Sequence, residues 1–152
     1  MKTKPTPKAQ LDAFIDKFTP EIGRQTNQIL ARMQRLLPGA HMLVYDNYNA
    51  LAIGFGTNDK LAGMIFSVAV FPRWVSLFFA NGPKLKDPKK LLKGSGTRVR
   101  HIVLTAPEML DDPDVRALMK QAIALAHPHL ATKGGTMIIK SISAKQRPRR
   151  PG

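Results

Sequence analysis

The chain has 152 residues, 43% of them apolar, and a formal net charge of +14. This length fits one domain that can bury its own core, and the apolar content excludes a disordered composition. The sequence has no cysteine, which excludes disulfides, thiolate metal sites and cysteine nucleophiles.

The positive charge is concentrated in three segments, namely the first eight residues, residues 84–101 and residues 133–152. A surplus of this size favours polyanionic neighbours such as nucleic acid, acidic lipid or an acidic protein. No run of 18 apolar residues occurs, so we expect no transmembrane helix and no membrane partner. Asp12, Asp16 and Lys17 interrupt the segment after the basic N-terminus, which argues against a secretory signal and predicts a cytoplasmic protein.

Residues 1–8 contain mainly Lys, Thr and Pro, and we expect a disordered basic arm. From residue 9 to residue 37, apolar residues recur at helical spacing and predict an amphipathic helix. Thr19 and Pro20 form an N-cap and first-turn pair, so a break near Phe18 stays open. Pro38 and Gly39 end the helix.

The following sequence is rich in β-branched and aromatic residues, which predict strands. We expect five strands, over residues 41–46, 50–55, 64–71, 74–80 and 97–105. An Asp-Asn-Tyr-Asn turn joins the first two, and a short Pro72-Arg73 link makes the third and fourth a hairpin. Strands without long helical crossovers are antiparallel.

A last helix is predicted from Asp112-Pro113 to Ala126, and Pro128 ends it. The order of helix, five strands and helix predicts an α+β fold, in which N-terminal and C-terminal helices cover one face of an antiparallel sheet of about five strands. This single domain would span residues 9–128. Residues 129–152 are expected to form a basic, mostly disordered tail, although "TMIIKSI" (136–142) could be a sixth edge strand.

The segment "KDPKKLLKGSGTRVRHI" (86–102) suggests a phosphate-binding loop, but its glycines lack the spacing of a P-loop. They also follow a helix-like run and precede a strand, which is the reverse of a dinucleotide-binding order. Asp87 and Pro88 instead predict the start of a short helix, and Gly94 its left-handed end.

Arg98 and Arg100 lie two residues apart in the predicted fifth strand, so their side chains would share a face about 6.5–7 Å apart. Two guanidinium groups at that distance could bind a carboxylate or a phosphate. The alternative is a solvated strand end or pairing with acids of a neighbour. With His101, and with Lys93 and Asn81 at the rim, these arginines form the predicted ligand-binding site.

Other residue types give weaker signals. The four histidines lack metal-ligand spacing, so we predict no metal site and no cofactor. The acidic cluster at residues 111–114 fits a helix start.

No serine has a recognisable catalytic base beside it, which predicts a protein that is not an enzyme. The predicted strands place most aromatic side chains in the core, although an exposed Trp74 or Tyr48 could stack on a nucleic-acid base.

Two runs, "LVYDNYNALAIGFG" and "FSVAVFPRWVSLFFANGPKLKDPKKLLKGSGTRVRHIVL", resemble the YdhG-like domain family, a bacterial family of mostly unknown function. The resemblance covers residues 22–125, and its most specific part is D-P-x-x-L-L-x-G-x-G followed by R-H-I. It implies an α+β fold related to the frataxin-like arrangement. Many relatives have Lys where this chain has Thr97.

One branch of that family is proposed to act as an iron chaperone. The carboxylates that could serve here, Asp12, Asp16 and Glu21, are sparse and lie among basic residues, whereas hard cations require several oxygen ligands.

Three functions remain open from the sequence. The first is a non-enzymatic binding domain for an anionic small molecule or an acidic partner protein, which would use the residues around Arg98. The second is sequence-independent binding of nucleic acid through the basic termini. The third is the iron-carrier role that the resemblance implies.

Overall fold

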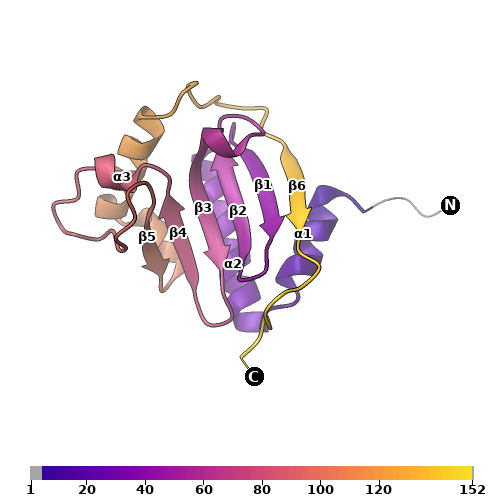
Figure 1. Cartoon of the computed structure of the whole chain (residues 1–152). Coiled ribbons are helices and arrows are strands. Elements are labelled where there is room, and N and C mark those ends of the chain that lie inside the picture. The colour runs from indigo at the N-terminus through magenta and orange to yellow at the C-terminus, as the bar shows by residue number, and fades with distance from the viewer. Residues whose placement is uncertain (1–4, 152) are drawn as a thin grey trace.

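A computed structural model of the chain describes residues 5–151 (Figure 1). Its helices are α1 (Pro7–Ile15), α2 (Pro20–Leu36) and α3 (Pro113–Ala124). Its strands are β1 (His41–Asp46), β2 (Leu51–Gly56), β3 (Met64–Val70), β4 (Val75–Phe79), β5 (Arg100–Leu104) and β6 (Met137–Ile142). Three short 3-10 helices, η1 (Leu61–Gly63), η2 (Gly82–Lys84) and η3 (Pro107–Asp111), lie in the connections. Half of the predicted N-terminal arm, residues 1–4, lies outside the described residues.

The strands form one six-stranded sheet in the order β5-β4-β3-β2-β1-β6. Neighbouring strands are antiparallel except β1 and β6, which are parallel. The α+β class is therefore confirmed, but the predicted antiparallel sheet of about five strands is wrong. The chain leaves α3, crosses to the far edge of the sheet and enters β6 in the same direction as β1 (Figure 1).

The C-terminal segment differs most from expectation. Residues 129–152 were predicted to be mostly disordered, yet β6 pairs with β1 along Met42–Asp46. Beyond β6, Arg149 is only 5% exposed. Strand β6 and the segment around Arg149 are thus part of the folded domain, and the alternative of a sixth edge strand was the better prediction.

The helix boundaries follow the local sequence. Thr6, Thr19 and Asp112 each cap a helix by accepting a hydrogen bond from a main-chain N–H of the first turn, and a proline follows each cap. The bend between α1 and α2 confirms the break near Phe18. Among residues 5–151, no helix combines the length and the apolar character that a membrane crossing requires.

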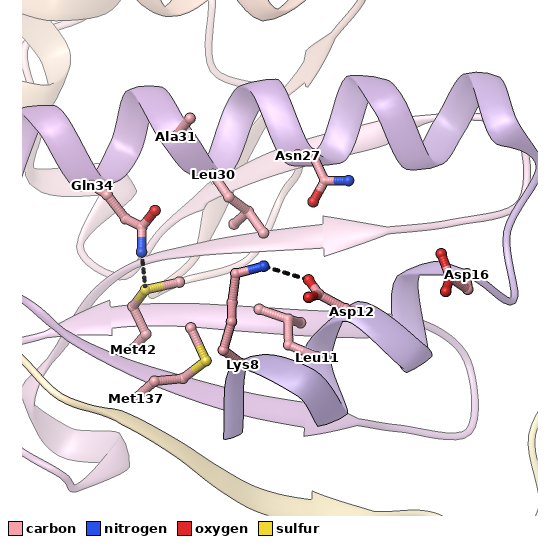
Figure 2. Close-up of a pocket in the computed structure, with 10 residues that line it drawn as sticks. All are labelled: Lys8, Leu11, Asp12, Asp16, Asn27, Leu30, Ala31, Gln34, Met42 and Met137. Carbon is pink, nitrogen blue, oxygen red and sulfur yellow. Dashed lines mark hydrogen bonds and ion pairs between the residues drawn. The ribbon is translucent and has the colours of Figure 1, made fainter. Parts of the chain in front are cut away.

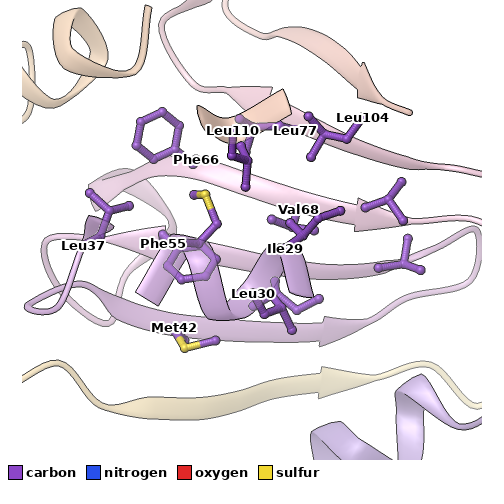
Figure 3. Close-up of a cluster of buried hydrophobic side chains, with 14 of the residues drawn as sticks. Ile29, Leu30, Leu37, Met42, Phe55, Phe66, Val68, Leu77, Leu104 and Leu110 are labelled. Carbon is purple, nitrogen blue, oxygen red and sulfur yellow. The ribbon is translucent and has the colours of Figure 1, made fainter. Parts of the chain in front are cut away.

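The core lies between the three helices and one face of the sheet (Figures 1 and 3). Alternate strand residues point into it, as the buried row Val44, Ile53, Val68 and Leu77 shows. Ile29 of α2, which is fully buried, packs against this face. The opposite face of the sheet carries no α-helix of the described chain, and we call it the open face.

The short helix predicted near Asp87 does not form. The Asp87 carboxylate accepts hydrogen bonds from the main-chain N–H groups of Leu91 (2.9 Å) and Leu92 (2.8 Å) and closes a turn. Lys90 has a positive φ of 52°, which a helix does not allow. Lys93 then pairs through its main chain with His101, which draws the segment along β5.

Candidate functional site

The five predicted ligand-binding residues lie on β5 and in the connections beside it. β5 begins at Arg100, so Arg98 lies outside the strand. Arg100 is opposite Phe79 on the core-facing side, and its Nε donates to the Gly96 carbonyl at 2.9 Å. A pair of guanidinium groups on one strand face is therefore absent from β5.

His101 lies on the other side of β5 from Arg100, opposite Phe78. Lys93 meets His101 through main-chain hydrogen bonds of 2.7 and 3.0 Å. Asn81 lines a small hollow beside the end of α3. Main-chain pairing thus brings Lys93 and His101 together, Arg100 packs against Gly82 beside Asn81, and anion binding by the five residues stays a prediction.

The middle of the open face consists of residues with small side chains or none. Strand alternation places Ala52, Gly54, Ser67, Ala69 and Ser76 there, in the middle of the sheet. Ser76 is only 1% exposed although no helix covers this face. Strand alternation places Phe78 on the same face as Ser76, and the same alternation, continued by one residue beyond the start of β4, brings Trp74 to the other side of Ser76.

Two aromatic pairs border these small residues, one in the connection between β3 and β4 and one on β4 and β5. Phe71 and Trp74 stack with their ring centroids 4.7 Å apart and their planes 20° apart. The rings of Phe78 and His101 are tilted against each other, with centroids 5.0 Å apart and planes 30° apart. Trp74 directly precedes β4 and is four residues from Phe78, or about 13 Å of extended chain. The open face thus offers two aromatic platforms in line.

A cavity of about 660 Å³ adjoins the first platform. Its lining comes from three parts of the chain and consists of Asn49, Phe71, Pro72, Arg73, Trp74, Arg147 and Pro148. Tyr48 lies close by, with the Arg147 guanidinium 5.9 Å from its ring centroid. Trp74 is 43% exposed and Tyr48 is 50% exposed, so both rings are accessible at this end of the sheet.

Residues 143–151, which we call the C-terminal strap, form one wall of this cavity. The strap is tied to the turn after β1 by main-chain hydrogen bonds from Ser143 to Asp46 (2.8 Å) and from Arg147 to Tyr48 (2.9 Å). The Arg150 Nε donates to the Lys17 carbonyl at 3.2 Å, which ties the strap to the bend between α1 and α2.

Asp46 anchors the strap from inside the fold. Its buried carboxylate accepts from Lys17 Nζ and from Arg149 Nη2, each at 2.8 Å. Burial acts to raise the pKa of Asp46, but hydrogen bonding by Lys17, Gln146 and Arg149 outweighs it and holds that pKa below its usual value. Asp46 is therefore ionised at neutral pH.

Arg149 is held on several sides. Its Nη2 also donates to the Asn47 carbonyl at 2.6 Å, and its guanidinium lies 5.6 Å from the ring centroid of Phe18. Its Nε and Nη1 are buried without a hydrogen-bond partner in the described part of the chain. The aromatic face compensates part of that desolvation.

A second groove, of about 590 Å³, lies between α1 and α2 (Figure 2). Lys8 pairs with Asp12 on one wall, and Gln34 donates to the Met42 sulfur at 3.2 Å across the floor. Asp16 also lines this groove, whereas Glu21 lines a different hollow beside Trp74. Residues 5–151 contain no group of three or more His, Cys, Asp or Glu side chains placed to hold a metal ion. The iron-carrier role stays a prediction.

No family model, no curated protein and no solved structure matches the chain. The resemblance to the YdhG-like family therefore stays a prediction.

Sequence reasoning missed Phe71, Phe78 and Arg147 as site residues. The signal for Phe78 was present, because strict alternation in "WVSLFF" puts Trp74, Ser76 and Phe78 on one face and the apolar residues between them on the other. Arg147 has no comparable signal, since only the folded strap brings it to the cavity.

Proposed function

We propose that the protein binds single-stranded nucleic acid, without sequence preference, on the open face of the sheet. The observation that carries this proposal is the pair of aromatic platforms, Phe71–Trp74 and Phe78–His101, on a helix-free sheet face of a protein with a net charge of +14. Proteins that bind single strands combine a positive surface with aromatic rings on which bases stack. Four-stranded RNA-binding sheets use the same arrangement.

The basic side chains near the platforms support this proposal. Arg73 and Arg147 flank the Phe71–Trp74 platform, and Lys93 adjoins His101. The ion pairs found among residues 5–151 involve none of these three side chains. Their charges are therefore available for phosphates, which carry most of the affinity in non-specific binding.

This proposal places binding on the open face and not on loose termini. The earlier hypothesis assigned binding to disordered basic ends, and deletion of residues 133–152 would test it. In the folded protein that deletion would remove both β6 and Arg149, the buried partner of Asp46. Point variants on the open face are the appropriate test.

The experiment is fluorescence anisotropy of a labelled oligothymidylate of about 16 nucleotides, the upper site size of one small single-strand-binding domain. Phe78→Ala should weaken binding by about 1–3 kcal/mol, the value of one base–aromatic stack. Arg73→Gln should weaken binding and flatten its salt dependence. The matched control is Arg35→Gln, since Arg35 is exposed on α2, on the other side of the sheet.

Absence of binding at low salt would refute the proposal. An equal loss in Arg35→Gln and Arg73→Gln would also refute it, because binding would then depend on total charge and not on the open face.

A further inference from the structure

We infer that the cavity beside Trp74 is a nucleotide site, which takes one nucleoside monophosphate unit and depends on the C-terminal strap for its basic wall. This inference rests on the proposed function and adds to it a specific position for one base and its phosphate.

The lining of the cavity has the chemistry that a nucleotide requires. Phe71 and Trp74 offer a stacked aromatic surface for a base. Arg73 and Arg147 offer two guanidinium groups, which bind phosphate through paired N–H donors. Asn49 lines the same cavity, and its amide can both donate to and accept from a base edge.

The size of the cavity fits this class of ligand. About 660 Å³ lies within the range of small-molecule sites, roughly 300–1,000 Å³. The groove between α1 and α2 is nearly as large, but it lacks aromatic residues and has Asp12 and Asp16 in its lining. Those carboxylates repel a phosphate, so the cavity beside Trp74 is the better nucleotide site.

The strap positions the phosphate-binding side. The main-chain N–H of Arg147 donates to Tyr48, and its guanidinium lies over the Tyr48 ring. Two residues further on, Arg149 is bound inside the fold by Asp46. Because Arg147 and Pro148 lie between these two anchors, the buried ion pair fixes the wall of the cavity. Arg149 is thus a positioning residue that contributes to the site through Arg147.

The chain contains one tryptophan, and it lines this cavity, so tryptophan fluorescence reports binding there, and the variants of Arg147 test that the change comes from this cavity. The experiment titrates the full-length protein with AMP, with adenosine and with ribose 5-phosphate. AMP should quench Trp74 saturably and bind more tightly than either fragment, because only AMP has both the base and the phosphate. Saturable quenching by adenosine that equals quenching by AMP would overturn the role of the arginines.

Variants then separate the parts of the site. Arg147→Gln should weaken AMP binding about tenfold or more, the value of one charge-assisted hydrogen bond to phosphate, and should leave adenosine binding unchanged. Arg149→Met should weaken AMP binding to a similar extent although Arg149 itself does not line the cavity. Arg35→Gln, on α2, should change neither affinity.

The outcomes distinguish this inference from the proposed function. If the oligothymidylate binds but AMP does not quench Trp74, the nucleotide site is wrong and binding on the open face stands. If neither binds, both proposals are wrong. If Arg149→Met keeps a native circular dichroism spectrum and full AMP affinity, the strap does not position the site.

Discussion

Substitution of Asp46 by Asn should destabilise the protein more than any single change at its two basic partners. The variant keeps the size of the side chain but removes the charge that Arg149 and Lys17 share. The side chain of Arg149, which is only 4% exposed, would remain buried but would have no ionised carboxylate as its partner. Lys17 is 42% exposed and can turn into water, so it contributes less to the loss.

The expected size follows from this burial. Removal of one partner of a buried ion pair costs about 3–5 kcal/mol, because an unpaired charge stays in the interior. Arg149→Met should cost less than Asp46→Asn, since Asp46 keeps its bond to Lys17 and two unpartnered nitrogens are removed. The double variant should cost less than the sum of the two single variants, because it leaves no buried arginine.

Urea unfolding of the wild type and the three variants measures these differences from the midpoints, provided that the slope m is unchanged. An Asp46→Asn variant within about 0.5 kcal/mol of the wild type, as is usual for a surface substitution, would refute the reasoning. Strict additivity in the double variant would refute the coupling between Asp46 and Arg149.

Three further predictions concern stability. The pKa of Asp46 is lower in the folded than in the unfolded protein, so its ionised form stabilises the fold fully above the unfolded pKa of about 4. This stabilisation is lost as the pH falls through the folded pKa. When Tm is measured against pH, it should therefore fall more steeply in acid for the wild type than for Asp46→Asn. Asp112→Ala removes the N-cap of α3 and should cost about 1 kcal/mol in urea unfolding; an unchanged midpoint would contradict this. Gly56→Ala should lower Tm more than Gly54→Ala, because the new Cβ lies 2.7 Å from a main-chain oxygen of η1, whereas at Gly54 it meets the flexible end of Met64. Equal Tm values would contradict this difference.

Local sequence signals predicted the elements whose ends are set locally. The Thr19-Pro20 and Asp112-Pro113 pairs placed two helix starts correctly, because the capping hydrogen bonds and the proline lie within one turn. The same reasoning failed at Asp87. That carboxylate does cap main-chain N–H groups, but a bridge from Lys93 to His101 draws the following residues into an extended path.

The errors in the fold came from contacts between distant residues. β6 pairs with β1 in the register Met42 to Met137, and its residues are half-buried or exposed, so its sequence has no clear alternation. Arg149 reaches Asp46 across 103 positions. Nothing within "RPRRPG" distinguishes Arg149 from the two exposed arginines beside it, so its burial has no local sequence signal.

The predicted start of the fifth strand was wrong for a similar reason. The two-arginine hypothesis required a strand that included Arg98, and the observed strand begins at Arg100. His101 was a better choice, since it lies on the open face against Phe78. Its aromatic partner Phe78 falls among the aromatic side chains that were assigned to the core. Because β4 has side chains on both faces of the sheet, composition alone does not tell a core residue from a residue of the open face.

The folded strap also changes what the net charge of +14 implies for binding. Residues 133–152 carry six basic residues, but Arg149 is buried and the side chains of Lys140 and Arg150 donate to main-chain carbonyls. A loose tail would offer all six to phosphates. The three basic side chains on the proposed surface, Arg73, Lys93 and Arg147, give a salt slope of only about −2, at roughly −0.7 per phosphate of a single strand. A measured slope much steeper than this would place nucleic acid on the termini and contradict binding on the open face.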